Sequence, residues 1–410
     1  MVMITKSIIK TVIVDQKSTL ASTNYGQTRG LLDKINHNLT NFALIISGIR
    51  RCGKSTLLNQ YISLNIKEAF IFLNFESAKL YTFSLSDFQL LDEIVAEMNC
   101  KWLIFDEIQI VEGWELYIRQ KLDESFKVLI TGSNASLLSK ELGTKLTGRH
   151  ITKELFPFSF NEFCSFKTLE FNEQSLNLYM NLGGFPGYLK EENSDIHLAL
   201  LDDIIYRDIA VRHQIRDVKS LKQLVVFLAS NCSKLISANK LKQYINVKST
   251  ATILEYLHYF EESYLIQLVP KFSYSQKVQL VNPRKIYFID NGLQQAISSS
   301  FSEDSGRKLE NMVFWELRRM GKTIFYFNEN GKECDFVIGK NDTVEQAIQV
   351  CYLMNLENQT REIDGLIEAM NYFSLDKGLI ITFNQEDVII KDGKRIELIP
   401  AYQFFGTNAS

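Results

Sequence analysis

The sequence predicts two α/β domains joined by a helical segment, within a chain of 410 residues. Up to about residue 155, short apolar runs alternate with helical stretches, whereas amphipathic helical periodicity dominates from about 172 to 290. After a linker rich in serine and glutamine, at 294–305, strand-like runs return. The predicted parts are a front α/β domain (1–165, with an N-terminal extension over 1–38), a helical segment (166–295) and a rear α/β domain (300–410).

Five apolar runs predict the strands of the front domain. They are FALIIS (42–47), AFIFLNF (69–75), KWLIF (101–105), KVLIT (127–131) and HITKELF (150–156). Uninterrupted apolar strands are expected where helices cover both faces of a parallel sheet. The front domain is therefore predicted to be a doubly wound parallel sheet.

A glycine-containing loop follows the first of these strands. It reads Gly48-Ile49-Arg50-Arg51-Cys52-Gly53-Lys54-Ser55, with Thr56 next, and it fits the pattern G-x-x-x-x-G-K-[ST]. Such a loop turns its backbone N–H groups toward phosphate oxygens, and the following helix adds the positive end of its dipole. We expect ATP as the ligand, with Lys54 reaching the β- and γ-phosphates and the Ser55 hydroxyl binding Mg²⁺. The charges of Arg50 and Arg51 serve either the nucleotide or an acidic partner.

An acidic pair, Asp106 and Glu107, ends the third predicted strand. The carboxyl ends of parallel strands meet at one crevice, so this pair is expected beside the phosphate loop. Asp106 is predicted to hold Mg²⁺ through water, and Glu107 to activate the water that attacks the γ-phosphate.

Other polar residues lie at the same predicted sheet edge. Ser133 and Asn134 follow the fourth strand, where either could sense the γ-phosphate or cap the next helix. Glu76 follows the second strand and is a further acid there. Arg149, before the fifth strand, is either an arginine finger for the nucleotide of a neighbouring subunit or a surface arginine.

The helical segment has the order of elements of a winged helix. Helices are expected over 221–232, 237–245 and 249–262, with a turn at Asn246, followed by strand-like runs at 264–269 and 285–290. Between Val218 and Leu254 there are six lysines and no acidic residue: Lys219, Lys222, Lys234, Lys240, Lys242 and Lys248. This run is a candidate contact for double-stranded DNA, and a solvated helical face is the alternative.

The rear domain is predicted to begin with a helix over 309–321. A hairpin over 323–339 follows, with a tight turn at Asn330-Gly331. A strand at 345–353, a helix at 361–373 and a strand at 378–383 complete the predicted elements.

Composition and charge exclude several classes of protein. With 45 basic and 48 acidic residues the net charge is −3, which excludes a uniformly basic nucleic-acid coat protein. The six cysteines are scattered, so neither a zinc site nor a disulfide framework is expected. Lys6 and Lys10 interrupt the apolar N-terminus, and no apolar run is long enough to span a membrane. A cytoplasmic protein without a membrane partner is expected.

These motifs together resemble the archaeal-type ATPase family of AAA+ proteins. The resemblance rests on GIRRCGKSTLL, FLNFES, WLIFDEIQIVEGWE, ITGSNASLL, LTGRHITKELFPFSFNEF and GGFPGYL in front, and on YFIDNGL, ECDFVI, IQVCY and IELIPAYQFF behind. It implies an AAA+ domain, a winged-helix segment and a C-terminal domain of the restriction-endonuclease-like, PD-(D/E)xK, type. It also implies a nucleotide loop with Lys54, a sensor at Ser133 or Asn134 and a finger at Arg149.

The rear half departs from the nuclease pattern that the resemblance implies. Glu310 and Asp335 stand where the first acids belong, but Gln349 and Cys351 stand where a Glu and a Lys are required. A neutral amide is a weaker ligand for a hard cation, and a thiol cannot supply a fixed positive charge. The rear domain is therefore predicted to be a degenerate nuclease, unless Lys340 or another lysine replaces the missing cation.

Three functions compete. The first is a Mg²⁺-dependent ATPase that couples nucleotide state to binding of DNA or a protein partner, with a homo-oligomer as a candidate assembly. The second is a Mg²⁺-dependent DNA nuclease gated by ATP. The third is a DNA-binding regulator in which the nucleotide is a structural ligand.

Overall fold

Each of the two units of the chain is built around its own β-sheets. The structure is a computed structural model that describes residues 3–22, 26–35, 41–135, 144–245, 247–299, 304–340 and 343–407. The chain divides into Met1–Leu155, here called the front unit, and Phe156–Ser410, the rear unit. The three-part division expected from the sequence stays a prediction.

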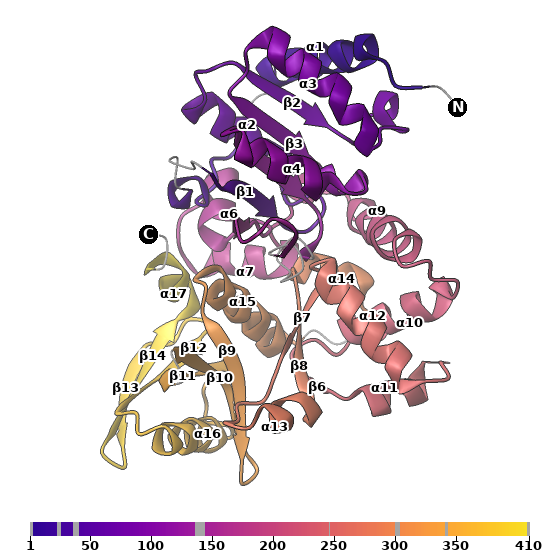
Figure 1. Cartoon of the computed structure of the whole chain (residues 1–410). Helices are drawn as coiled ribbons and strands as arrows, with labels where there is room; N and C mark the ends of the chain where they lie inside the picture. The colour runs from indigo at the N-terminus through magenta and orange to yellow at the C-terminus, as the bar shows by residue number, and fades with distance from the viewer. Residues whose placement is uncertain are drawn as a thin grey trace. The chain divides into compact units, whose positions relative to one another are not determined.

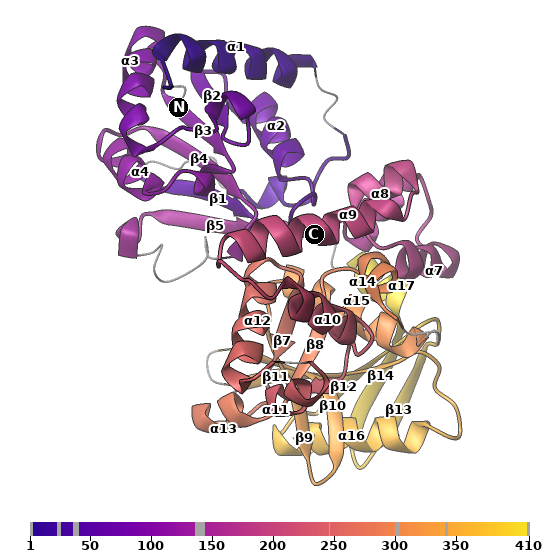
Figure 2. The ribbon, with the colours of Figure 1, turned by 90° about the vertical axis from the view of Figure 1, so that its right-hand side faces the viewer.

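The front unit contains a five-stranded parallel sheet, as predicted. Its strands are β1 (Ala43–Ser47), β2 (Phe70–Asn74), β3 (Trp102–Asp106), β4 (Lys127–Gly132) and β5 (His150–Glu154). Their order is β2-β3-β4-β1-β5; Figure 1 labels β1, β2 and β3, and Figure 2 labels all five. The strands β1, β3 and β4 are buried almost throughout, whereas β5 lies at an edge and stays partly exposed. Crossover helices place the carboxyl ends of β1, β3 and β4 at one edge of the sheet.

Helices cover this sheet. They are α1 (Lys6–Ser22), α2 (Lys54–Asn65), α3 (Phe88–Met98) and α4 (Trp114–Asp123). The predicted N-terminal extension is part of the front core, because Ile9, Val12 and Ile13 of α1 pack in the same cluster as Ile71 and Leu73 of β2.

Gln16 of α1 completes the edge strand β2. Its amide nitrogen donates to the carbonyl of Asn74 at 3.1 Å, and its amide oxygen accepts from the backbone N–H of Asn74 at 2.9 Å. Figure 2 shows α1 beside β2 in the front unit. The Gln16 side chain thus pairs with the backbone N–H and carbonyl of Asn74, which on an edge strand would otherwise be available to another strand.

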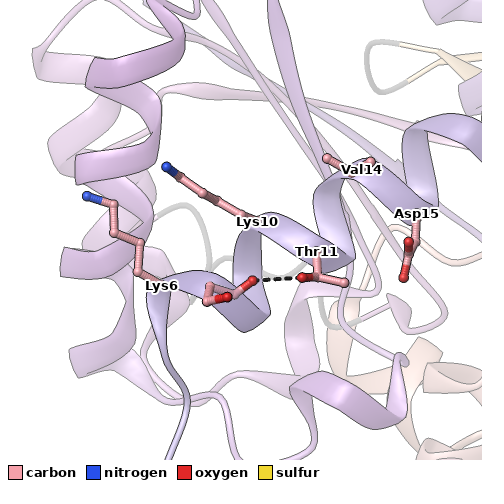
Figure 3. Close-up of a pocket in the computed structure, with 6 residues that line it drawn as sticks. Lys6, Lys10, Thr11, Val14 and Asp15 are labelled. Atoms are coloured by element: carbon pink, nitrogen blue, oxygen red, sulfur yellow. Dashed lines mark hydrogen bonds between the residues drawn. The ribbon is translucent and has the colours of Figure 1, made fainter.

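The outer side of α1 carries a shallow hollow. Figure 3 shows the side chains that line it, which are Lys6, Ser7, Lys10, Thr11, Val14 and Asp15. The ammonium groups of Lys6 and Lys10 form ion pairs with Glu97 of α3. All the lining residues come from one helix and none from loop 48–55, so the hollow is separate from the predicted nucleotide site.

The rear unit begins with helices. They are α6 (Phe160–Lys167), α7 (Glu173–Leu182), α8 (Pro186–Glu191), α9 (Asp195–Asp203), a π-helical stretch (Ile204–Val211) and α10 (Val218–Ala229). The helices α11 (Ala238–Tyr244) and α12 (Thr250–Glu262) follow, and Asn246, the predicted turn, lies outside the described residues.

A small antiparallel sheet accompanies α10 to α12. It consists of β6 (Leu235–Ile236), β7 (Ile266–Val269) and β8 (Arg284–Phe288), in the order β6-β8-β7. The predicted strand-like runs correspond to β7 and β8. Their connection is longer than a simple hairpin, because it contains α13 (Gln276–Val281).

A six-stranded mixed sheet closes the rear unit, after α14 (Asn291–Ile297) and α15 (Ser305–Arg319). The expected linker at 294–305 is partly wrong, because α14 extends into it. The strands are β9 (Thr323–Glu329), β10 (Lys332–Lys340), β11 (Thr343–Cys351), β12 (Lys377–Thr382), β13 (Asp387–Lys391) and β14 (Lys394–Pro400), in the order β13-β14-β12-β11-β10-β9. The helix α16 (Gln359–Tyr372) packs against β10 and β11, and α17 (Ala401–Thr407) ends the described chain.

Two hairpins of this sheet turn through residues with positive φ. The predicted turn at Asn330-Gly331 has φ of 54° and 74°. A second hairpin, β13–β14, turns at Asp392-Gly393 with φ of 51° and 74°. Both pairs match the sequence preference of tight hairpin turns, so the second could have been predicted as readily as the first.

None of the helices in the described part of the chain combines the length and the apolar character that a membrane crossing requires.

Candidate nucleotide site

The predicted phosphate loop lies between the end of β1 and the start of α2. A Cβ added to Gly48 would lie 2.0 Å from the carbonyl oxygen of Leu155, so the loop approaches that backbone more closely than any side chain allows. Gly53 adopts φ of 102°, a conformation that favours glycine. Close packing therefore favours glycine at position 48, and backbone conformation favours it at position 53.

Lys54 is buried at the base of the loop. Its ammonium donates to the carbonyls of Gly48 and Ile49 at 3.0 and 3.1 Å, and it lies 3.6 Å from Oε1 of Glu107. Burial lowers the pKa of Lys54, but the charge of Glu107, with smaller contributions from Cys52 and Asp106, outweighs burial and raises it overall. The ammonium is charged and held at the loop.

Asp106 receives three side-chain hydrogen bonds. The Ser55 hydroxyl donates to Oδ2 at 2.8 Å, the Asn74 amide donates to the same oxygen at 2.9 Å, and the Thr131 hydroxyl donates to Oδ1. Burial, and then the charge of Glu107, raises the pKa of Asp106. The structure thus brings Ser55 and Asp106 together as the sequence predicts.

Asn74 and Thr131 are residues that the sequence reasoning missed. Asn74 is the last residue of β2, and Thr131 lies near the end of β4. The available signal was the one already used for Asp106, a polar residue at the carboxyl end of an apolar strand.

Glu107 follows β3 in a left-handed backbone conformation, with φ of 55°. Its carboxylate accepts a hydrogen bond from the Gln109 amide, and a further one from Ser133. Burial raises the pKa of Glu107, but Lys54 and these hydrogen bonds lower it below its ordinary value. Glu107 is therefore an ionised, oriented carboxylate next to the loop.

The other predicted residues lie around this centre. Asn134 is buried, and its backbone carbonyl accepts from the Ser47 hydroxyl at 2.8 Å. The guanidinium of Arg50 forms an ion pair with Glu76 at 2.9 Å. Arg51 is exposed at the loop, and Thr56 lies in the first turn of α2. The helix proposed to follow Asn134 falls largely outside the described residues.

Arg149 lies just before β5, where its guanidinium forms an ion pair with Asp123 at 2.7 Å. Its Nε also donates to the Thr147 hydroxyl at 3.1 Å. Within this chain it is thus engaged by α4.

Arg29 is a second residue that the motif did not reveal. It is 3% exposed, and its guanidinium donates to the carbonyl of Cys52 at 2.7 Å. A Cβ at Gly53 would lie 3.2 Å from the same guanidinium nitrogen. Arg29 therefore holds the backbone of the phosphate loop at Cys52.

Three of the four residues predicted at the rear site come together. Glu310 and Asp335 contact the same ammonium, that of Lys285, and Gln349 accepts a hydrogen bond from the backbone N–H of Asp335 at 3.1 Å. Cys351 lies in the hydrophobic cluster beneath α16. The side chain of Lys340 lies outside the described residues. Lys285 itself was not predicted.

The lysine run of the helical segment divides into two groups. Lys222 forms an ion pair with Asp202 at 2.6 Å, and Lys234 donates to the Asn231 side chain at 3.1 Å. The other members are exposed, namely Lys219, Lys240, Lys242 and Lys248.

Comparisons with known proteins give a family. The family model of the AAA domain matches residues 40–164, and that of a domain of unknown function, DUF8612, matches residues 173–304. The uncharacterized protein MJ1544 of Methanocaldococcus jannaschii is 38% identical over 391 residues, which cover 88% of this chain and 87% of that protein. An uncharacterized protein of Haemophilus influenzae is 31% identical over 363 residues, covering 84% of this chain and 89% of that protein.

Among solved structures, AMPPCP-bound DnaA from Aquifex aeolicus matches with a TM-score of 0.30 and 12% identity, covering 61% of this chain and 88% of that one. This likeness is too distant to add to the sequence matches. The family is shown by the relatives that span both units. The chain belongs to the same protein family as MJ1544, and its front unit carries an AAA domain.

Proposed function

We propose that the front unit binds ATP together with Mg²⁺ and hydrolyses it. The observation that carries this proposal is the contact of 2.8 Å between the Ser55 hydroxyl and Oδ2 of Asp106, beside the Lys54–Glu107 pair at 3.6 Å. A phosphate loop, a hydroxyl, a metal-binding acid and a second, ionised acid are the parts that phosphoryl transfer requires. The match of the AAA domain over 40–164 supports the same function.

The residues at this edge fit Mg²⁺. The Ser55 hydroxyl and the Asp106 carboxylate are the oxygen ligands that a hard cation prefers, and they already face each other. Hydrogen bonds from Asn74 and Thr131 orient the carboxylate. Mg²⁺ bound by Ser55 and Asp106 would neutralise phosphate charge and make the γ-phosphate easier to attack.

Lys54 and Glu107 have complementary roles in this proposal. The carbonyls of Gly48 and Ile49 now accept from the Lys54 ammonium, and the phosphates of ATP would replace them as acceptors. Glu107, which Gln109 and Ser133 hold by hydrogen bonds, then takes the proton of the attacking water. Its lowered pKa keeps it ionised at neutral pH, as a general base requires.

In the same mechanism, Ser133 or Asn134 is the proposed sensor of the γ-phosphate and Arg149 the proposed arginine finger. Ser133 and Asn134 follow β4 at the edge that holds Asp106, and Ser133 already bonds Glu107. Arg149 would act on a neighbouring subunit's nucleotide, for which it must leave Asp123. The role proposed for Arg149 requires a homo-oligomer. The roles proposed for Ser133 and Asn134 do not.

The helical segment is proposed to be a winged helix that binds double-stranded DNA. Three helices, α10 to α12, and the three-stranded sheet β6-β8-β7 support this proposal, as do the exposed lysines Lys240, Lys242 and Lys248. Binding to duplex DNA should weaken steeply between low and moderate salt. If affinity does not change with salt, or if duplex DNA leaves ATP turnover unaltered, a protein partner replaces DNA in the proposal.

The rear sheet is proposed to be a degenerate restriction-endonuclease-like domain. The closeness of Glu310 and Asp335 to one cation supports it, as does the neutral Gln349 at the place of a required acid. The alternative is an active nuclease gated by ATP, which must cleave plasmid DNA with Mg²⁺ and lose that cleavage in Asp335→Ala.

Binding of a fluorescent ATP analogue tests the site. Lys54→Ala removes the ammonium that the phosphates need, so we expect binding to weaken by at least about tenfold, in line with loss of a charged hydrogen bond. Lys67→Ala is the matched control, because Lys67 is an exposed lysine just after α2. Equal binding by wild type and Lys54→Ala would remove the loop from the proposed function.

A further inference from the structure

Lys285 is a buried lysine at the centre of three carboxylates. Its side chain is 3% exposed. The ammonium lies 2.7 Å from Oδ1 of Asp335, 2.7 Å from Oε1 of Glu333 and 3.2 Å from Oε1 of Glu310. An ammonium has three N–H donors, so each carboxylate can accept one of them.

These groups come from three elements of the rear unit. Lys285 belongs to β8 of the small sheet, Glu310 to α15, and Glu333 and Asp335 to β10 of the large sheet. Tyr287, two residues along β8 from Lys285, donates its hydroxyl to Oε1 of Glu310 at 2.7 Å. Strand β8 thus places the Lys285 ammonium beside acids of α15 and β10, and the Tyr287 hydroxyl beside Glu310 of α15.

A further set of contacts fixes the acids. Oδ2 of Asp335 accepts from the backbone N–H of Val350 at 2.9 Å, and the Asp335 N–H donates to Gln349. The Gln349 amide in turn donates to Glu362 of α16 at 2.6 Å. Asp335 therefore has its second oxygen occupied, and only Oδ1 points to the centre of the cluster.

Carboxylate oxygens that converge from separate elements form the usual ligand set of Mg²⁺, Mn²⁺ and Ca²⁺. Here their common neighbour is an ammonium, and the contacts of 2.7 to 3.2 Å are those of N–H donors. They are wider than the roughly 2.1 Å of a Mg²⁺–oxygen bond. Within the described ranges, no group of three His, Cys, Asp or Glu side chains is placed to hold a metal ion.

We propose that Lys285 is a built-in cation that takes the place of a divalent metal ion in a carboxylate site formed by Glu310, Glu333 and Asp335. The site then neither binds a metal ion nor activates a metal-bound water. Its ion pairs instead hold β8, α15 and β10 together. The proposal is independent of ATP hydrolysis in the front unit. It also gives a physical reason, independent of Gln349, why the rear unit would lack the nuclease activity that the proposed function already denies it.

The pKa shifts at this cluster are consistent with Lys285 acting as its cation. Burial raises the pKa of Glu310 to about 8, against the lowering effect of Lys285. Burial lowers the pKa of Lys285, but the charges of Asp335, Glu310 and Glu333 raise it well above its ordinary value. The ammonium of Lys285 thus stays charged among its three acids.

Binding of Mn²⁺ to the full chain without nucleotide, measured by paramagnetic resonance of the free ion, tests the proposal. Lys285→Ala should create an Mn²⁺ site, and Lys285→Ala with Asp335→Asn should bind Mn²⁺ at least about tenfold more weakly, because a neutral amide replaces a charged carboxylate ligand. Any Mn²⁺ held at the front unit cancels between these two proteins. Thermal unfolding should show that Mn²⁺ stabilises Lys285→Ala and not the double variant.

The wild-type protein supplies a second arm that holds even if Lys285→Ala fails to fold. Asp335→Asn in the wild-type background should leave Mn²⁺ binding unchanged, since the site is already filled. Two results overturn the proposal: wild-type binding of Mn²⁺ that Asp335→Asn abolishes, or a folded Lys285→Ala that binds no more Mn²⁺ than wild type. The first result would make Lys285 the missing cation of a working metal site.

Discussion

The hydroxyl of Ser55 donates to Oδ2 of Asp106 at 2.8 Å, which joins the first turn of α2 to the end of β3. The two residues lie 51 positions apart in the chain. Their contact joins the phosphate loop to the acidic edge of the sheet. This is the relationship from which the proposed metal site follows.

Loss of either member of this pair should change the requirement for Mg²⁺. Ser55→Ala removes an oxygen ligand, and Asp106→Asn replaces a charged carboxylate ligand with a neutral amide, so half-maximal ATP turnover should need at least about tenfold more Mg²⁺. Titration of ATPase activity with Mg²⁺ measures this. Ser63→Ala, an exposed serine near the end of α2, is the control and should titrate like wild type. An unchanged requirement in both variants would contradict the assigned metal ligands.

Gln109 should help to lower the pKa of Glu107, the proposed general base. Its amide donates to Glu107 and helps to lower the pKa of that carboxylate. In Gln109→Ala the pKa of Glu107 rises, so the base is protonated at higher pH and the acidic limb of kcat/KM moves to higher pH. The profile of kcat/KM against pH measures the shift. Gln120→Ala, a glutamine of α4 paired with Glu124, is the control, and a profile that does not move in Gln109→Ala would exclude this role.

Gly183 should be essential for stability of the rear unit. It has φ of 72°, and an added Cβ would lie 2.2 Å from Oδ1 of Asp290. Gly183→Ala therefore combines backbone strain with a clash against a buried acid, and should cost more than about 3 kcal/mol. Denaturant unfolding of the full chain measures this.

Gly187 of the same GGFPG motif is the matched control. It lies in α8, and nothing comes within 4 Å of an added Cβ. Gly187→Ala should be neutral or stabilising by up to about 1 kcal/mol, since alanine favours a helix. A similar loss of stability in both variants would mean that the clash with Asp290 is not the cause.

Glu310 should make stability depend on pH. Its pKa is raised from 4.5 in the unfolded chain to about 8, so the folded protein retains a proton that the unfolded chain has lost. Stability should therefore fall as pH rises from about 4.5 to 8. The groups that face Glu310 are Lys285, Tyr287, Asp335 and Cys232.

Glu310→Gln tests this dependence. The amide oxygen can still accept hydrogen bonds but does not titrate, so the variant should gain stability relative to wild type between pH 5 and pH 8. Denaturant unfolding at both pH values gives the comparison, with the exposed Glu357→Gln as control. A difference between Glu310→Gln and wild type that is the same at both pH values would rule out this titration.

The front site was predictable because its signals are local in the sequence. Eight consecutive residues form the loop, and Asp106 and Glu107 directly follow an apolar strand. The positions of Asn74 and Thr131 needed the strand order, which brings β2 and β4 to either side of β3. Arg29 lies upstream of the motif, and only its contact with the Cys52 carbonyl reveals it.

The rear site was harder to predict because its members are far apart in the chain. Lys285 and Asp335 are separated by 50 positions and belong to different sheets. A lysine at the start of an apolar strand is usually solvated, and nothing in RKIYF indicates three buried acids around it. The sequence shows that no lysine stands two residues after Gln349, but it does not indicate that Lys285 lies among the acids.

The most direct test of ATP hydrolysis is phosphate release by the wild-type protein and by Glu107→Gln, with ATP binding measured on the same samples. The proposed function predicts steady phosphate release by wild type, and a loss of at least about a hundredfold in Glu107→Gln with ATP binding retained, because only the general base is removed. Equal phosphate release by the two proteins, or none by wild type with and without DNA, would contradict it.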